Sequence, residues 1–354
     1  MMAVKKRYLC CLVTVICLVW YELLAREISN EETLGTSKNK GEWKPPAGPG
    51  DLMQPLHSHT EGTLTNTSDR RGMSGDDAES QVWASEQQRR QQAVREACRG
   101  HQSTFKYNLP RSSSALNYLL VDDRHKAIYC FVPKVACTNW KRLWMVLTGL
   151  KKENDHVMKM PKTLVHRHHE MMMLIKQPHS TRVLLKKLNT YTKLLVVRDP
   201  YQRLLSAYRD KFEDKGEEFY IKNYAPVIRT FRQNVSDSRS PKPDTGVTFS
   251  EFVSYILSLP KTSFDEHWRP YQQLCFPCDI HYDVIGKYET LVKDSEHFLR
   301  LIGAPETLHF PAYAPSRTSE LLQAYMASLS HHQRQGLRKV YEMDFEMFQY
   351  RDKL

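Results

Sequence analysis

The sequence predicts an α/β fold, a single domain in which helices pack around a central parallel sheet. Three segments rich in β-branched and aromatic residues, 126–132, 192–197 and 283–288, predict strands. A segment with the composition and end signals of a helix follows each of them. Strands that alternate with helices favour parallel pairing within one sheet. Apolar patterning begins near Leu116, so we assign residues 113–354 to this domain.

The helices of the domain are predicted from their end signals. Thr248 and Glu251 have the spacing of a capping box, which marks the start of a helix. Gly149 and Gly303 follow helical segments at the position where glycine commonly ends a helix. The predicted helices cover residues 139–147, 201–212, 249–259 and 291–302.

The N-terminus predicts entry into the secretory pathway. Residues 8–24 form an apolar run that only Glu22 interrupts, and three basic residues precede it. We interpret this run as a transmembrane signal-anchor, and the positive-inside rule then places residues 1–7 in the cytosol and the rest in the lumen. The alternative is a cleaved signal peptide, although bulky residues leave no clear cleavage site. Either topology excludes nucleic acid as a partner.

A polar, weakly patterned segment at 25–112 separates this run from the domain. It contains the proline- and glycine-rich stretch 45–50 and too few apolar residues to build a core. We interpret it as a lumenal stem, in which residues 85–98 could form a charged helix. Asn66 in this segment and Asn234 in the domain begin N-glycosylation triplets.

The net charge of +11 predicts an anionic partner. Because the topology excludes nucleic acid, three kinds of anionic partner remain. They are a nucleotide cofactor, an acidic membrane and an acidic polysaccharide. The stretch 157–193 holds eight basic residues and one acid, Glu170, and is either a solvated face or a groove for a polyanionic glycan. The basic residues are Lys159, Lys162, Arg167, Lys176, Arg182, Lys186, Lys187 and Lys193.

Five of the eight cysteines lie beyond the apolar run, and an odd number leaves at least one thiol unpaired or paired between chains. We expect structural disulfides at Cys275 and Cys278, with the partners open, and Cys137 is the candidate free thiol. No second C-x-x-C occurs in this part of the chain, which disfavours zinc. The five are Cys98, Cys130, Cys137, Cys275 and Cys278.

The first motif that could take part in binding or catalysis is the segment 132–141, between a predicted strand and a predicted helix. Such a turn directs backbone N–H groups and a helix N-terminus toward one point, which suits a phosphate. Lys134 adds a positive charge, and Thr138 and Asn139 add side-chain donors. The glycine and lysine pattern of a Walker A loop is absent. The alternative is an ordinary turn with a stray lysine.

The second motif, 197–209, also joins a strand to a helix. Arg198 ends the strand, and its guanidinium could bind a phosphate through two parallel hydrogen bonds. Ser206 lies about two helical turns further on and could donate a hydroxyl bond to the same group. Alone, these residues could equally be a solvated arginine and a serine on a helix surface.

Together the two motifs resemble the cofactor motifs of the Golgi carbohydrate sulfotransferases. The resemblance is strongest to the chondroitin and dermatan 4-O-sulfotransferases and covers about Leu119 to Tyr350. It is carried by YCFVPKVACTNWKR, VVRDPYQRLLSAYRDKF, DEHW and VIGKYETL. The apolar run and the stem resemble the corresponding segments of these enzymes only in type and not in sequence.

The resemblance implies a sulfotransferase-like domain with a P-loop-like turn that binds 3′-phosphoadenosine 5′-phosphosulfate (PAPS). The first loop would hold the 5′-phosphosulfate and the second the 3′-phosphate, without a metal. Arg317 is a further candidate for the phosphates, unless it is a surface arginine. The implied cofactor-binding residues are Lys134, Val135, Ala136, Cys137, Thr138, Asn139, Trp140, Arg198, Asp199, Pro200, Tyr201, Gln202, Arg203, Leu204, Leu205, Ser206 and Arg317.

The implied reaction is sulfo transfer to the 4-hydroxyl of N-acetylgalactosamine in chondroitin, with dermatan left open. Lys134 would neutralise charge on the leaving oxygen, and a histidine near neutrality would serve as the base. His166 and His267 fall where the family pattern has a histidine, and we prefer His166. The implied protein is a single-pass type II protein of the Golgi membrane, and its oligomeric state is open. Alternatives are another N-acetylgalactosamine- or glucuronate-bearing acceptor, or a tethered, non-catalytic glycan-binding protein.

Overall fold

The computed structural model describes one compact unit that begins at Arg70. The predicted domain boundary at residue 113 therefore falls inside this unit. The predicted membrane run at 8–24, most of the predicted stem, and both Asn66 and Asn234 lie outside the described residues. No described helix is long and apolar enough to cross a membrane. The described residues are 75–101, 114–152, 157–177, 180–213, 216–232, 246–311 and 317–352.

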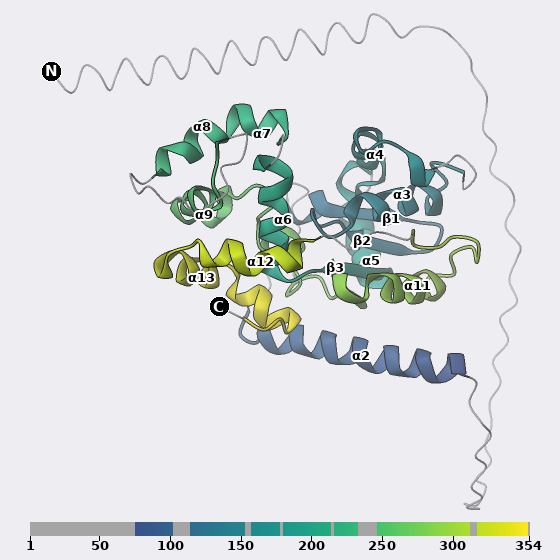
Figure 1. The fold of residues 1–354 in the computed structure, drawn as a ribbon. Coiled ribbons are helices and arrows are strands. Elements are labelled where there is room, and N and C mark those ends of the chain that lie inside the picture. Colours follow the sequence, from purple (N-terminus) through teal and green to yellow (C-terminus); the bar gives the residue numbers. More distant parts are fainter. Residues whose placement is uncertain are drawn as a thin grey trace, which may run out of the picture. The chain divides into compact units, whose positions relative to one another are not determined.

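A four-stranded sheet in the order β1-β2-β3-β4 forms the centre of the unit (Figure 1). The three predicted strands are confirmed as β2 (Ala127–Cys130), β3 (Thr192–Val197) and β4 (Val284–Lys287), and they pair in parallel. The sequence did not reveal β1 (Leu119–Asp122), which pairs antiparallel to β2. The sheet is therefore mixed, and the expectation of an all-parallel sheet is corrected at this edge.

The parallel register places the two motifs at one edge of the sheet. Cys130 at the end of β2 lies opposite Leu195 of β3, and Leu195 lies opposite Ile285 of β4. The chain leaves both β2 and β3 toward the same side, because parallel strands share their carboxyl edge. The loops that begin at Phe131 and Arg198 are therefore neighbours.

The four predicted helices are present with their ends shifted by at most two residues. They are α3 (Cys137–Leu147), α6 (Pro200–Phe212), α9 (Phe249–Ser258) and α11 (Leu291–Leu301). The predicted capping box of α9 is formed on both sides. The other α-helices are α2 (Gly75–Ala97), α4 (Lys162–His168), α5 (Thr181–Thr190), α7 (Glu218–Asn223), α8 (Ala225–Ile228), α10 (Tyr271–Leu274), α12 (Thr318–Ala327) and α13 (His331–Phe348). Short 3-10 turns occur at Ser114–Tyr118, Val157–Lys159, His169–Met172, Leu174–Lys176, Arg229–Phe231, Lys261–Ser263 and Tyr288–Thr290.

Two hydrophobic cores support the unit. One surrounds the sheet and includes Trp140 and Trp144 of α3, and both indoles are fully buried. The other lies among α6, α7, α8, α9, α12 and α13 and centres on aromatic rings such as Tyr208, Phe252 and Trp268. Because α6 starts at the sheet and buries its apolar face in the second core, it connects the two.

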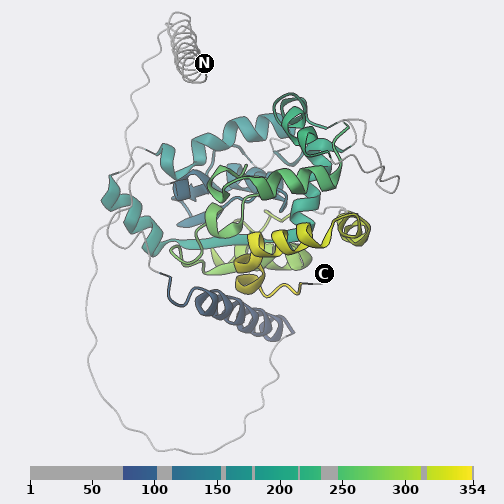
Figure 2. The same ribbon diagram turned by 90° about the vertical axis from the view of Figure 1, so that its left-hand side faces the viewer.

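Helix α2 covers the free edge of β4, which explains why part of the predicted stem is ordered (Figures 1 and 2). The Gln87 side chain accepts a hydrogen bond from the Ile285 N–H at 2.9 Å, and Arg90 donates to the Ile285 carbonyl at 2.7 Å. Arg90 also forms a buried ion pair with Asp294 at 2.8 Å. The helix thereby pairs backbone groups that an edge strand would otherwise expose.

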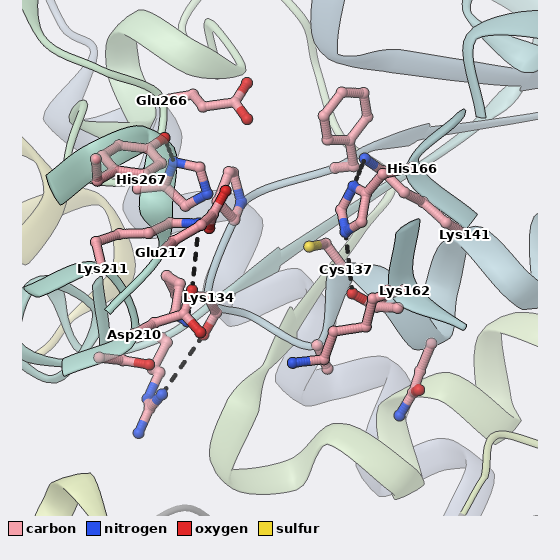
Figure 3. Close-up of a pocket in the computed structure, with 18 of the residues that line it drawn as sticks. Lys134, Cys137, Lys141, Lys162, His166, Asp210, Lys211, Glu217, Glu266 and His267 are labelled. Atoms are coloured by element: carbon pink, nitrogen blue, oxygen red, sulfur yellow. Dashed lines mark hydrogen bonds and ion pairs between the residues drawn. The ribbon is translucent and has the colours of Figure 1, made fainter. Parts of the chain in front are cut away.

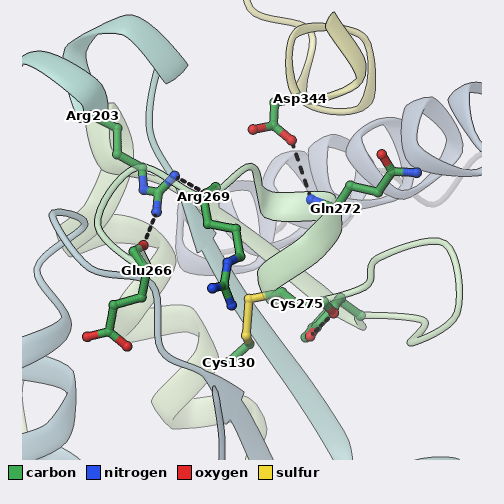
Figure 4. The surroundings of a disulfide bond; sticks show 8 residues. Cys130, Arg203, Glu266, Arg269, Gln272, Cys275 and Asp344 are labelled. Atoms are coloured by element: carbon green, nitrogen blue, oxygen red, sulfur yellow. Dashed lines mark hydrogen bonds between the residues drawn. A yellow bond between two sulfur atoms is a disulfide. The ribbon is translucent and has the colours of Figure 1, made fainter. Parts of the chain in front are cut away.

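Two disulfides tie distant segments together and answer a question that the sequence left open. Cys98, just after α2, is bonded to Cys278, and Cys130 at the end of β2 is bonded to Cys275 (Figure 4). The prediction of structural disulfides at both C-x-x-C cysteines is confirmed. Among the cysteines that the structure describes, Cys137 alone is free, as predicted, and it is buried.

Candidate active site

A cavity of about 740 Å³ opens at the carboxyl edge of β2 and β3 (Figure 3). Its walls come from the loop after β2, from α3 and α4, from α6 and α7, and from the segment 266–267. Both sequence motifs contribute to it, and so do both candidate bases. The predicted residues that line it are Lys134, Ala136, Cys137, Thr138, Asn139, His166, Arg198, Ser206 and His267.

The loop after β2 has an unusual backbone. Lys134 and Ala136 both have positive φ, at 72° and 56°, although neither is glycine. Alternation of left-handed residues with ordinary ones bends a chain into an anion-binding concavity, and such strain persists where a site requires it. Ala136 is the N-cap of α3, and no side chain caps this helix start. The first turn of α3 can therefore offer its N–H groups to a ligand.

Lys134 carries the charge of this loop. Its Nζ lies 3.0 Å from the Asp210 carboxylate, which also contacts Lys211 at 3.3 Å. Burial lowers the pKa of Lys134, and the charge of Asp210 opposes that effect. Lys211 reaches a second carboxylate, Glu217, so positive and negative groups alternate along this wall.

Arg198 leaves β3 directly into the cavity wall and is almost fully buried. Its backbone N–H donates to the Tyr271 hydroxyl at 2.8 Å, and that hydroxyl donates to the Arg198 carbonyl at 3.1 Å. The guanidinium lies over the ring of Tyr288, 4.3 Å from its centre. Ser206 of α6 lines the same cavity.

His267 is held by a carboxylate. Its Nδ1 lies 2.7 Å from Asp265 Oδ1 and 2.9 Å from the Tyr220 hydroxyl. Burial alone would raise the pKa of Asp265, but the hydrogen bonds and charge of His267 outweigh it, and the pKa is lowered. An ionised carboxylate only accepts hydrogen bonds, so in the neutral form of His267 Nδ1 carries the proton and Nε2 is an acceptor.

His166, on α4, has the opposite arrangement. Its Nδ1 lies 3.2 Å from the ammonium of Lys141, which can only donate, so the neutral ring carries its proton on Nε2. That nitrogen lies 3.4 Å from the Thr138 hydroxyl. Desolvation and then the charge of Lys141 lower the pKa of His166 to about 4. The ring is therefore a weak base with a donor at Nε2.

A comparison with known proteins assigns the family. The sequence model of the sulfotransferase family matches residues 117–351. The chain belongs to the sulfotransferase family. Carbohydrate sulfotransferase 11 of Rattus norvegicus is 40% identical over 270 residues, which are 74% of this chain and 75% of the relative. This sulfotransferase is therefore an enzyme that sulfates carbohydrate.

Two further relatives support the same assignment. Carbohydrate sulfotransferase 12 of Mus musculus is 40% identical over 253 residues, 66% of this chain and 60% of that protein. Carbohydrate sulfotransferase 9 of Homo sapiens is 34% identical over 277 residues, 75% of this chain and 60% of that protein. No solved structure matches the chain.

Several residues that the resemblance implied as cofactor ligands do not line the cavity of the sulfotransferase. Asp199 caps α6 by accepting from the Tyr201 and Gln202 N–H groups, both at 3.0 Å. Arg317 is 80% exposed beside Glu320 and does not line the cavity. The remaining implied residues that do not line the cavity are Val135, Trp140, Pro200, Tyr201, Gln202, Arg203, Leu204 and Leu205.

Arg203 shows what these residues do instead. Its buried guanidinium donates to the carbonyls of Pro133, Arg269 and Glu266, at 3.1, 2.7 and 2.8 Å (Figure 4). These carbonyls belong to the loop after β2 and to the segment that carries His267. Arg203 thus fixes two walls of the cavity relative to each other without contacting its interior.

Other cavity residues were missed in the sequence. Lys141 of α3 is 2% exposed and stands one helical turn after Cys137, a spacing that could have revealed it. Asp210 and Lys211 lie about one turn beyond Ser206 on α6, so helical spacing could have revealed them as well. The acidic and aromatic residues beside His267 gave no local signal, because they come from a short helix and from loops. They are Glu217, Phe219, Tyr220 and Glu266.

The basic stretch 157–193 does not form one exposed row. Lys187 is buried and contacts Asp123 at 2.7 Å, and Lys193 is buried beside Asp283 at 2.9 Å. These two buried, paired lysines belong neither to a solvated face nor to a glycan groove, the two alternatives that the sequence left open. Lys162 is exposed and lines the cavity.

Proposed function

We propose that this sulfotransferase transfers a sulfo group from PAPS to the 4-hydroxyl of N-acetylgalactosamine in chondroitin, with dermatan as the alternative chain. The observation that carries the proposal is the convergence of the Lys134 loop, Arg198, Ser206 and two histidines on one cavity. The motif resemblance supports the donor and the acceptor, and the carbohydrate sulfotransferase relatives support the acceptor class.

The residues fit a nucleotide with phosphates at both ends. The uncapped start of α3 and the Lys134 ammonium suit the 5′-phosphosulfate, and Arg198 with Ser206 suits the 3′-phosphate. PAPS supplies an activated sulfo group when it is bound. Lys134 then neutralises the charge that develops on the leaving oxygen. A sulfo group carries less charge than a phosphoryl group, so this chemistry needs no metal, and the described residues hold no group of side chains suited to one.

His267 is the base that we propose, in place of the sequence preference for His166. The Asp265 carboxylate keeps the proton on Nδ1, which leaves Nε2 free to accept the proton of the acceptor hydroxyl. The Lys141 contact gives His166 the reverse tautomer, which suits a hydrogen-bond donor. His267 thus serves as a hydrogen-bond acceptor and His166 as a donor.

The proposed location is the Golgi lumen, with a type II anchor at residues 8–24. Two disulfides within the described residues fit an oxidising compartment. Protease treatment of sealed microsomes should spare the catalytic unit, because the anchor would place it inside. Digestion of this unit without detergent would contradict the topology.

The test of the activity is transfer of labelled sulfate from PAPS to a panel of desulfated glycosaminoglycans, followed by disaccharide analysis. We expect 4-sulfated N-acetylgalactosamine from chondroitin, and loss of both product and nucleotide binding in Lys134→Ala. Transfer to a different position or chain would reject the acceptor, and no transfer to any glycan would reject the proposed reaction.

The charge of the acceptor gives a second test. Exposed cations at the cavity mouth, such as Lys162, should attract the carboxylates of chondroitin, and salt screens such contacts. The Michaelis constant for chondroitin should therefore rise with salt more steeply than that for PAPS. Lys162→Glu should raise the former constant, whereas Lys186→Glu, also exposed but outside the cavity lining, should change it less. An equal rise in the Michaelis constant for chondroitin in both variants would reject a role for the cations at the cavity mouth in binding chondroitin.

A further inference from the structure

Lys141 is a buried cation that faces the cavity. It is 2% exposed, and its ammonium lies 3.2 Å from Nδ1 of His166 and 3.9 Å from the ring centre of Phe131. Both of these neighbours are uncharged. Within the part of the chain that the structure describes, no carboxylate lies within 4.0 Å of the ammonium. Glu266 of the same cavity raises the pKa of Lys141 only from a greater distance. An unpaired buried charge is costly, so this arrangement favours a closer anion.

The other buried lysines show how unusual this is. Lys187 contacts Asp123 at 2.7 Å, Lys193 contacts Asp283 at 2.9 Å, and Lys211 contacts Asp210 at 3.3 Å. Lys141 is thus the exception among the buried lysines of the described residues, and it is on the cavity wall. Its pKa is lowered by burial, and an incoming anion would reverse that effect.

The groups beside Lys141 are donors as well. Because the ammonium donates to Nδ1, His166 presents an N–H at Nε2, and the Thr138 hydroxyl lies 3.4 Å from it. Figure 3 shows Lys141 and His166 on one side of the cavity, and Lys134, Asp210, Lys211 and His267 on the other. The first side thus offers a cation and a ring N–H, which together complement the oxygens of an anion.

The position of these donors indicates which anion they receive. In an in-line transfer the entering and leaving oxygens lie on one axis, and the charge of the transferring group spreads over three oxygens around that axis. The proposed base His267 and the proposed leaving-group cation Lys134 are on one wall, linked through Asp210, Lys211 and Tyr220. Because the three equatorial oxygens are spaced around that axis, at least one of them then points toward the opposite wall.

We propose that Lys141, together with the Nε2–H of His166, binds the equatorial oxygens of the sulfo group during transfer. The inference rests on the proposed PAPS reaction. In that step the acceptor oxygen forms a bond to sulfur and its proton passes to Nε2 of His267. The bond from sulfur to the leaving oxygen breaks, and its electron pair stays on the nucleotide phosphate beside Lys134. Lys141 neutralises the charge that remains on the sulfo oxygens.

Lys141→Met tests the proposal, because methionine keeps the length of the side chain and removes the charge. We expect kcat with PAPS and desulfated chondroitin to fall about 100-fold, as when one donor to a developing charge is removed. Adenosine 3′,5′-bisphosphate lacks the sulfo group, so its Kd should stay within about twofold. The melting temperature should not fall, because the change removes an uncompensated buried charge.

Lys187→Met is the matched control, a buried lysine whose partner Asp123 is outside the cavity. It should lower the melting temperature and leave kcat unchanged. An unchanged kcat in Lys141→Met would overturn the proposal. An equal loss of bisphosphate affinity would also overturn it, since Lys141 would then bind the nucleotide. A higher KM for chondroitin alone, absent with carboxyl-reduced chondroitin, would assign Lys141 to an acceptor carboxylate instead.

His166 gives an independent test in case Lys141→Met does not fold. His166→Leu removes the N–H and should lower kcat, whereas His166→Gln keeps a donor and should restore most of the activity. Equal activities of these two variants would overturn the proposal. Wild-type protein that transfers sulfate to no glycan would instead reject the proposed function, so the two failures are distinguishable.

Discussion

The carboxylate of Asp265 accepts hydrogen bonds from the Nδ1 and the backbone N–H of His267, at 2.7 and 2.9 Å. A single carboxylate therefore fixes both the tautomer and the orientation of the ring. The Tyr220 hydroxyl lies 3.2 Å from the other oxygen of Asp265 and adds to this constraint. The arrangement resembles the way that a carboxylate orients the histidine of hydrolytic enzymes.

The first prediction concerns the base. His267→Gln should lower kcat by about 10²–10⁴-fold, since glutamine cannot take the acceptor proton. Asp265→Asn should also lower kcat, because an amide can stabilise the wrong tautomer of His267. His166→Gln is the matched control and should retain most activity. The measurement is kcat with saturating PAPS, and a larger loss in His166→Gln than in His267→Gln would reverse the two roles.

The second prediction separates a ligand from a wall residue in one motif. Arg198→Ala should weaken binding of adenosine 3′,5′-bisphosphate by about 1.5–3 kcal/mol, the value of a charge-assisted contact, while the protein stays folded. Arg203→Ala leaves the carbonyls of Pro133, Glu266 and Arg269 without their donor and should lower the melting temperature. Calorimetric titration and thermal unfolding check the pair. Unchanged nucleotide affinity in Arg198→Ala would remove this residue from the site.

The third prediction concerns acid stability. The pKa of His166 is lowered to about 4 from an ordinary value of 6.5, and that of His169 is also lowered to about 4. Between these values the unfolded chain binds protons that the folded chain does not. The free energy of unfolding should therefore fall as the pH drops from about 6.5 to about 4. Denaturant unfolding at several pH values should give a shallower fall in His166→Gln, and an identical slope would contradict the prediction.

The fourth prediction concerns the helix on the sheet edge. Arg90→Ala removes one partner of the buried pair with Asp294 and should cost about 3–5 kcal/mol of unfolding free energy. Arg89→Ala is the matched control, because this side chain is half-exposed and its pair with Glu86 contributes little. Chemical denaturation measures both. Equal effects would mean that α2 is not a structural part of the catalytic unit.

Local signals in the sequence predicted much of the fold. The strand at 192–197 and the capping box before α9 were found because they depend on neighbouring residues alone. The resemblance implied that Lys134 and Arg198 serve one cofactor, and the structure places both on one cavity because parallel strands share a carboxyl edge. By contrast, β1 is a four-residue buried run without alternation, so its pattern did not distinguish it.

What the sequence could not supply depends on contacts between distant residues. The stem residues that form α2 are mostly polar, and their order depends on contacts with distant residues of β4, α11 and α13. The choice between the two histidines depended on which polar group faces each Nδ1. Asp265 lies two residues from His267, whereas Lys141 lies on a different helix from His166. Tautomers of this kind cannot be predicted from spacing.

The place of α2 has a consequence for how the enzyme would leave a membrane. A protease that cut the chain before residue 70 would remove the predicted anchor and leave α2 seated on β4. The Cys98–Cys278 bond would keep that helix attached even if it were nicked between residues 98 and 114. The released fragment would thus keep the edge of β4 covered.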